Sequence, residues 1–187
     1  TGMVGKALAT RIAGLGHDVT VGAREAGSET LDSFADIEGV TTADFAGAAR
    51  DAELVINATN GMHSLAALAA AGDLGGKVVL DVANELDASG GMPPKPLAGP
   101  DNSLGRKIQE AFPAAHVVKS LNTMNCNIMV DPSLVPGDHV VFVSGDDGGA
   151  KALVIGLLKQ FGWRDQQIID LGGIDSAASA EMMMSIW

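Results

Sequence analysis

Short apolar runs alternate with amphipathic stretches along most of this chain of 187 residues. The apolar runs, rich in Val, Ile and Leu, predict buried strands, whereas apolar residues three or four positions apart predict helices. The predicted strands occupy residues 17–22, 40–42, 53–58, 77–82, 116–119, 139–143 and 167–171. The predicted helices occupy residues 6–13, 29–37, 44–51, 63–71, 103–112, 150–161 and 176–187.

Strands that alternate with helices in this way are typical of a parallel sheet. The sequence therefore predicts an α/β fold with a doubly wound, mostly parallel, Rossmann-like sheet and helices on both faces. Two segments, 84–102 and 120–137, are predicted to be irregular, and the first is too long to be a simple connector. No repeat or linker divides the chain, so we expect one domain over residues 1–187.

Within this domain, residues 1–119 are expected to form a dinucleotide-binding core, and residues 120–187 to complete the cleft for a second substrate. A doubly wound sheet places its first strand immediately before a glycine-rich turn. That turn opens the sequence here, so we expect the first strand to be missing from it. The chain is accordingly expected to be truncated at both ends.

The glycine-rich turn is Thr1-Gly2-Met3-Val4-Gly5, which has the spacing of the later part of a G-x-G-x-x-G fingerprint. Gly2 would let the backbone approach a pyrophosphate, and Gly5 would let the following helix pack closely on the sheet. Free N–H groups of Met3 and Val4 at the helix start would favour an anion. Because such a pattern also arises by chance, it does not establish binding by itself.

The next predicted strand ends at Gly22-Ala23-Arg24. An NAD enzyme usually places Asp or Glu in this region, where the carboxylate accepts a hydrogen bond from the ribose 2′-hydroxyl. Arg24 instead suits the 2′-phosphate of NADP(H), through charge-assisted hydrogen bonds and stacking on the adenine. An isolated arginine is ordinarily just an exposed side chain, but its position after a glycine-rich turn favours the cofactor role.

Small polar residues follow two later strands, at the edge where ligands bind in open α/β sheets. Ala58, Thr59 and Asn60 follow one strand, and Ala83 and Asn84 follow the next. These residues are candidates to line the ribose and the nicotinamide. They would serve equally well as turn formers and helix caps.

Composition narrows the choice of partners and chemistry. A net charge of −11, with no basic cluster longer than Arg106-Lys107, argues against nucleic acid and anionic membrane surfaces. The single cysteine, Cys126, excludes an internal disulfide and a cysteine-based zinc site, and we expect it to be a small packed residue. The four histidines are scattered, so no metal site is predicted. With no signal peptide and no long apolar run, a cytoplasmic location is expected.

Further motifs extend the pattern over nearly the whole chain. They are Asp81-Val82-Ala83-Asn84-Glu85-Leu86, Gly90-Gly91-Met92-Pro93-Pro94, Val118-Lys119-Ser120-Leu121-Asn122-Thr123-Met124-Asn125, Gly137-Asp138-His139, Phe161-Gly162-Trp163 and Asp170-Leu171-Gly172-Gly173-Ile174. Together with the glycine-rich turn and Gly22-Ala23-Arg24, these motifs resemble the NADPH-dependent coenzyme F420 reductase (F420H2:NADP oxidoreductase) family.

The resemblance implies a Rossmann-like domain that carries NADP(H), with the deazaflavin coenzyme F420 in an adjoining cleft. A Ser-Arg pair after the second strand reads the 2′-phosphate in that family. Here Ala23 replaces the serine, so one hydroxyl contact is absent. Because the same domain type also serves flavin-dependent proteins, the expected co-substrate is F420 or a related flavin.

Hydride transfer between nicotinamide C4 and deazaflavin C5 depends on close positioning of the two rings and needs no side-chain acid or base. No catalytic group is therefore predicted. Residues 120–129 are the candidate pocket for the second ring, with Asn122, Thr123 and Met124 as positioning residues and 90–94 as its other wall. Asn122 and Asn125 could equally tether an irregular loop.

Two other classes of function stay open. A reductase of another small substrate, such as an imine or a 3-hydroxyacid, would need a proton donor, which typically lies in a second, helical domain. A non-catalytic NADP(H)-binding sensor or regulatory domain would need none. The Met182-Met183-Met184 run in the final helix is compatible with a homodimer, and equally with packing against chain outside this sequence.

Overall fold

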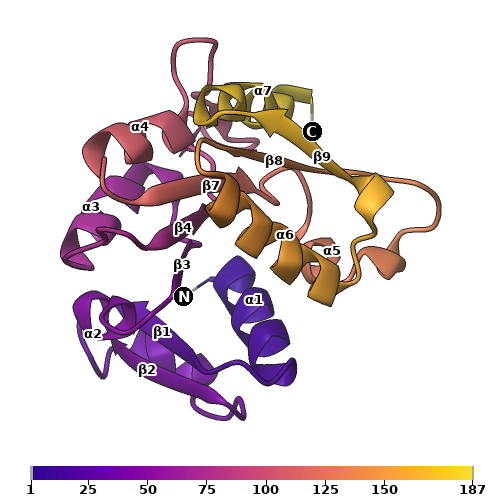
Figure 1. Ribbon diagram of the computed structural model, residues 1–187. Helices are drawn as coiled ribbons and strands as arrows, with labels where there is room; N and C mark the ends of the chain where they lie inside the picture. The colour runs from indigo at the N-terminus through magenta and orange to yellow at the C-terminus, as the bar shows by residue number, and fades with distance from the viewer. Residues whose placement is uncertain (1, 187) are drawn as a thin grey trace.

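The computed structural model describes residues 2–186 and has a central sheet of five strands in the order β3-β4-β7-β8-β9 (Figure 1). Each strand coincides with one of the predicted apolar runs to within a few residues. The strands are β3 (Leu54–Asn57), β4 (Val78–Asp81), β7 (His116–Ser120), β8 (Val141–Gly145) and β9 (Ile168–Gly172).

Two hydrophobic cores lie on opposite faces of this sheet. Leu80 and Val118 belong to one core, whereas their neighbours Val79 and Val117 belong to the other, as the alternation of side chains along a strand requires. The first core is covered by α1 (Met3–Gly14), α5 (Cys126–Val130) and α6 (Gly148–Phe161), and the second by α3 (Ser64–Ala70), α4 (Leu104–Ala111) and α7 (Ala177–Met182). In Figure 1, α3 and α4 lie to the left of β4 and β7, and α5 and α6 to the right.

The prediction of an α/β fold with a mostly parallel sheet is confirmed. β3, β4 and β7 are parallel to one another, and β9 is parallel to β8. β8 is antiparallel to β7. The chain between them contains only the short helices α5 and η3 (Pro132–Leu134), which do not carry it back to the starting edge of the sheet.

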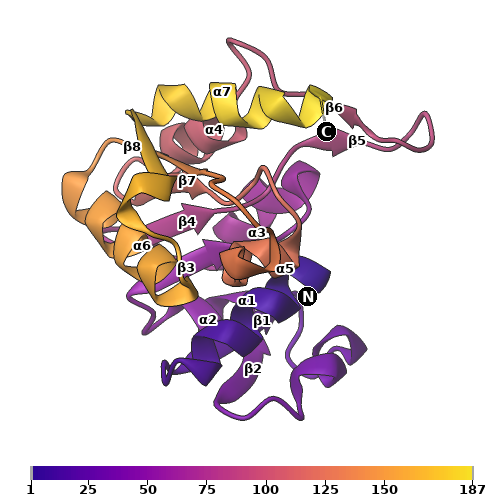
Figure 2. The same cartoon turned by 90° about the vertical axis from the view of Figure 1, so that its right-hand side faces the viewer.

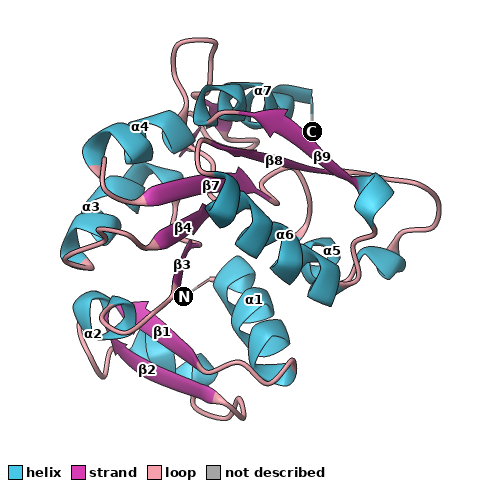
Figure 3. Ribbon diagram, in the orientation of Figure 1, coloured by secondary structure: helices cyan, strands magenta, loops and turns pink. Residues whose placement is uncertain are grey.

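Two further strands, β1 (Val19–Ala23) and β2 (Val40–Asp44), form a separate parallel pair, onto which α2 (Phe45–Ala49) packs (Figure 3). β1 and β3 do not pair. A cleft of about 780 Å³ is lined by both of these strands and by apolar side chains of α1, including Leu8 and Ile12.

Several predicted elements need correction. The predicted helix 29–37 is a 3₁₀ helix, η1 (Glu29–Phe34), whose buried Leu31 and Phe34 are three residues apart, as the three-residue turn requires. The predicted final helix, 176–187, consists of α7 and the 3₁₀ helix η6 (Met183–Ile186), and it is preceded by a further 3₁₀ helix, η5 (Ile174–Ser176). The segments expected to be irregular contain α5, η3 and a hairpin of β5 (Leu86–Asp87) and β6 (Lys95–Pro96).

Candidate functional site

The glycine-rich turn lies at the start of α1, beside the residues that follow β3. Gly2 is the N-cap of α1, and Thr1 lies outside the described residues. Gly2 offers no capping side chain and the first turn holds no acidic residue, so the N–H groups at Met3 and Val4 are available to an anion. A Cβ atom on Gly5 would lie 4.0 Å from the Ala58 Cβ. The helix start and the end of β3 therefore form one edge of a common crevice.

Ala23 and Arg24 lie where β1 ends. Ala23 is buried and pairs in register with Asp44, whereas Arg24 is exposed. Gly22, just before them, lines the same cleft as Gly5. Ala23 and Arg24 are not among the residues that line this cleft, and Arg24 is exposed to solvent.

Thr59 belongs to a hydrogen-bonded cluster at the end of β3. Its hydroxyl donates to Asn57 Oδ1 over 2.6 Å, and the Asn57 amide donates to Ser64 Oγ and to Asp81 Oδ1, over 2.8 Å in each case. Asn60 is exposed and caps the short helix η2 (Gly61–His63). Capping therefore accounts for Asn60, whereas Thr59 connects the crevice to the buried Asp81.

Ala83 and Asn84 are held from two directions. The Ala83 N–H donates to Asp81 Oδ1 over 3.2 Å, and the Ala83 carbonyl accepts from the Lys119 ammonium. The side chain of Asn84 donates to the Asn122 carbonyl over 2.8 Å, and the Asn122 amide donates back to Asn84 Oδ1 over 3.0 Å. This reciprocal pair joins the segment after β4 to the loop after β7.

Leu121 gives that loop its direction. Its φ of 64° is in the left-handed region, although the residue is not glycine and its side chain is buried. Asn122 is buried and occupied with Asn84, so it tethers the loop, whereas Thr123 and Met124 are half-buried. Asn125 caps α5 by accepting from the Asn127 N–H.

The segment expected to form the other wall of the second-ring pocket, residues 90–94, lies between β5 and β6. Met92 there is 85% exposed, and the hairpin projects from the body of the molecule (Figure 2). Among the hydrogen bonds of residues 2–186, none joins this segment to the loop that contains Asn122.

Three buried charges at this edge were not predicted as site residues. The Lys119 ammonium is 2.8 Å from Asp81 Oδ2 and 3.0 Å from Glu181 Oε1, and all three side chains are at most 3% exposed. Burial raises the pKa of the Asp81 carboxyl, and the Lys119 charge opposes that rise. An available signal was the presence of Asp81 and Lys119 in strands that are otherwise apolar, because both faces of such strands are normally buried.

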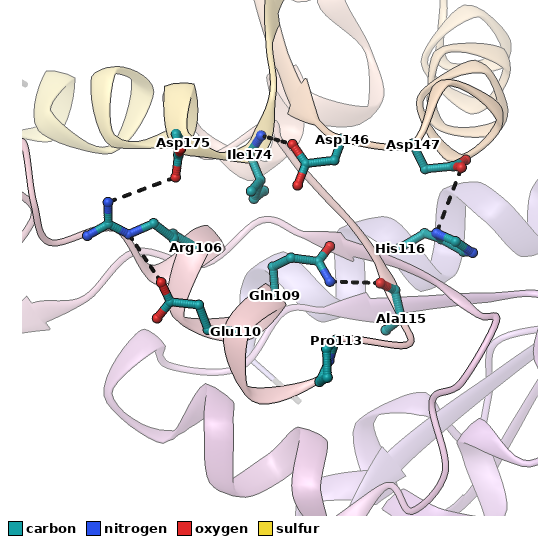
Figure 4. A pocket seen from close by; sticks show the side chains of 10 residues that line it. All are labelled: Arg106, Gln109, Glu110, Pro113, Ala115, His116, Asp146, Asp147, Ile174 and Asp175. Carbon is teal, nitrogen blue, oxygen red and sulfur yellow. Dashed lines mark hydrogen bonds and ion pairs between the residues drawn. The ribbon is translucent and has the colours of Figure 1, made fainter.

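A second cavity, of about 600 Å³, is lined by side chains around the start of β7 (Figure 4). Most of its charged side chains are acidic: Arg106 lies near Glu110 and Asp175, His116 lies near Asp147, and Asp146 also lines it. Because ligands of open α/β sheets bind at the carboxyl ends of the strands, this cavity is at the wrong edge for a dinucleotide.

Residues 2–186 contain no group of three or more His, Cys, Asp or Glu side chains arranged to hold a metal ion. Within the same residues, no helix has the length and apolar character needed to cross a membrane.

Comparisons with known proteins agree with this geometry. The family described as NADP oxidoreductase, coenzyme F420-dependent, matches residues 1–85. A candidate F420-dependent NADP-reductase from Arthrobacter sp. FB24 is 49% identical over 100% of this chain and 88% of its own, with a TM-score of 0.94. Among proteins with curated functions, none matches the chain.

More distant structures share the fold. The hypothetical protein SMa0349 from Sinorhizobium meliloti is 27% identical, over 96% of this chain and 84% of its own, with a TM-score of 0.76. A reductive aminase from Aspergillus terreus, in complex with NADPH4, cyclohexanone and allyl amine, is 21% identical, with a TM-score of 0.69. The match covers 99% of this chain but 56% of the aminase, and at this identity it shows the fold alone.

Proposed function

The chain belongs to the coenzyme F420-dependent NADP oxidoreductase family, and from this premise we propose that it transfers a hydride between NADP(H) and a deazaflavin such as F420, or a related flavin. The observation that carries the proposal is the approach of the uncapped start of α1 to Ala58 at the end of β3, where the following loop packs on the peptide after β4. Such a helix start, with its free N–H groups, suits a pyrophosphate.

The residues of the proposed cofactor site can be assigned to successive parts of the dinucleotide. Arg24 would bind the 2′-phosphate, with Ala23 beside it, and the turn from Thr1 to Gly5 would hold the pyrophosphate. The ribose and nicotinamide would lie against residues that follow β3 and β4. These are Ala58, Thr59, Asn60, Ala83 and Asn84.

The second ring would lie near Thr123 and Met124, which are half-buried in the loop fixed by Asn122. This assigns residues 1–119 to cofactor binding and residues 120–187 to the second-substrate cleft. With both bound, nicotinamide C4 would supply a hydride to deazaflavin C5 and a ring nitrogen would take a proton from solvent, giving NADP⁺ and the reduced deazaflavin in the direction of NADPH oxidation. The protein's part is to align the two rings and exclude water.

The decisive experiment has two stages. The protein is first titrated with NADPH and NADH by calorimetry, and we expect tighter binding of NADPH. NADPH oxidation is then followed without oxygen after addition of F420, FAD or FMN. F420-dependent oxidation supports the proposal, and oxidation with FAD or FMN alone replaces F420 with a flavin. Binding of NADPH without turnover would indicate a sensor, and no binding would refute the cofactor assignment.

A further inference from the structure

A row of polar side chains crosses the main sheet at the carboxyl ends of three parallel strands. Asn57 in β3 is in register with Asp81 in β4, and Asp81 is in register with Lys119 in β7. Since residues in register point to the same face, these side chains replace the apolar layer formed by Val55, Val79 and Val117 one pleat earlier.

Every hydrogen-bonding group at the centre of this row has a partner. The Lys119 ammonium has three N–H bonds and three oxygen partners, on Asp81, Glu181 and the Ala83 carbonyl. Asp81 accepts from Lys119, from the Asn57 amide and from the Ala83 N–H. Each ion buried away from water loses several kcal/mol of solvation free energy. A protein with well-packed apolar residues at these positions would therefore often be as stable or more stable. Stability alone is therefore a poor explanation of the row.

Glu181 anchors the far side of Lys119. Its carboxylate accepts from the N–H groups of Leu104 and Gly105 and from the Ser103 hydroxyl, at the start of α4. The partial positive charge of a helix start stabilises an anion there. Lys119 is consequently held between a fixed carboxylate on α7 and the end of β4, and α4 and α7 lie side by side (Figure 2).

The ion pair of Asp81 with Lys119 holds both polar backbone groups of Ala83, since Asp81 accepts its N–H and Lys119 donates to its carbonyl. Asn84 comes next and pairs with Asn122, while Gly61 packs directly against the Asn84 peptide. A shift at Ala83 would therefore move both loops that border the proposed nicotinamide position.

We propose that Lys119 is a positioning residue for the nicotinamide half of the cofactor, acting through Asp81 and the backbone of Ala83. The proposal rests on the function proposed above. Lys119 does not touch the reacting atoms; it fixes the segment from Ala83 to Asn84 on which the nicotinamide would lie.

The test compares Lys119→Met, the double variant Lys119→Met/Asp81→Asn, and Lys151→Met as a matched control. Lys151, in α6, also pairs with an aspartate: its Nζ is 2.9 Å from Oδ2 of Asp170. Asp170 is in β9, at the far edge of the sheet from the proposed site. For each variant, three properties are measured: the dissociation constants for NADPH and NADH, the thermal stability and the turnover. Lys119→Met should weaken the binding of NADPH and of NADH by about tenfold or more. The factor should be similar for the two, because the nicotinamide half is common to them. Lys151→Met should change neither constant by more than about twofold.

The pH dependence distinguishes positioning from simple packing. In Lys119→Met the uncompensated charges near Ala83 are Asp81 of β4 and Glu181 of α7, and Glu181 keeps its partners on α4. Protonation of Asp81 should therefore recover part of the affinity as the pH is lowered, and wild type should show no such recovery. The double variant lacks the unpaired charge of Asp81, and Glu181 keeps its N–H partners at the start of α4, so the protein should fold. It should still bind NADPH weakly, because the Ala83 carbonyl has lost its donor.

Wild-type protein is titrated first, so that the two proposals fail separately. No NADPH binding by wild type would refute the proposed function and this inference with it. Normal wild-type binding, with a folded double variant of unchanged affinity and turnover, would overturn the role of Lys119 alone. Equal losses in the Lys151→Met control would also overturn it.

Discussion

A Cβ atom on Gly61 would lie 2.2 Å from the carbonyl oxygen of Asn84, and 2.6 Å from the amide nitrogen of Glu85. The loop after β3 therefore packs on the peptide after β4 with no room for any side chain. Because both neighbours are backbone atoms, neither can rotate away. The contact makes the two loops of the proposed cofactor site mechanically dependent on each other.

Gly61→Ala should consequently displace one of these loops. Forcing extra atoms into a packed site typically costs about 1–3 kcal/mol, and we expect at least this loss in the free energy of unfolding, measured with denaturant. NADPH affinity should fall as well. Gly156→Ala is the control, since Gly156 is in α6 with nothing within 4 Å of an added Cβ. That change should stabilise the protein by about 0.5–1 kcal/mol. A Gly61→Ala protein as stable as wild type would contradict the packing argument.

Arg24→Ala should weaken NADPH much more than NADH, because only NADPH carries the 2′-phosphate. A hydrogen bond to a charged group contributes roughly 1.5–3 kcal/mol, which corresponds to a loss of about ten- to a hundredfold in NADPH affinity. Calorimetric titration of both cofactors checks this. Arg50→Ala is the matched control, because Arg50 is an exposed arginine at the end of α2 and should affect neither cofactor. Equal losses for NADPH and NADH in Arg24→Ala would remove the 2′-phosphate assignment.

The main strands could be predicted because their apolar runs end in clear turn residues. The run from Lys77 to Val82 and the strand β4 agree almost residue for residue. The five-residue helix α5 could not be found in this way, because one turn and a half carries no helical period. Its only local signal is Asn125, which caps it.

The edge of the sheet at which the crevice lies could be predicted from topology, because ligands of open α/β sheets bind at the carboxyl ends of the strands. Lys119, Asp81 and Glu181 escaped the same reasoning because their contacts join β7, β4 and α7, which are distant in sequence. The left-handed backbone at Leu121 was equally hidden, because leucine gives no indication of a positive φ. Both features depend on tertiary packing.

Acid should destabilise the protein partly through Asp131. Two hydrogen bonds donated by Ser133, the larger effect from its hydroxyl and the smaller from its N–H, hold the pKa of Asp131 below its ordinary value of 3.8. A carboxyl with a lowered pKa stabilises the fold fully above that ordinary value, and the contribution disappears as the pH falls through the lower, folded value. Asp131→Asn should therefore reduce stability at neutral pH but converge with wild type in strong acid. Unfolding curves over a pH series check this, with exposed Asp36→Asn as the control. A constant difference at every pH would contradict it.

Leu121 combines a buried side chain with a left-handed backbone, and two substitutions separate these properties. Leu121→Ala removes the packing and keeps the strain, so it should cost about 2–5 kcal/mol of unfolding free energy. Leu121→Gly removes the same packing and also relieves a left-handed conformation that costs roughly 1–2 kcal/mol. The glycine variant should therefore be the more stable of the two by about 1 kcal/mol, although glycine is normally the more destabilising residue. Denaturant unfolding of both variants tests this order. If Leu121→Ala were the more stable, the left-handed backbone would carry no strain, and the direction of the Asn122 loop would have to come from the Asn84 pair alone.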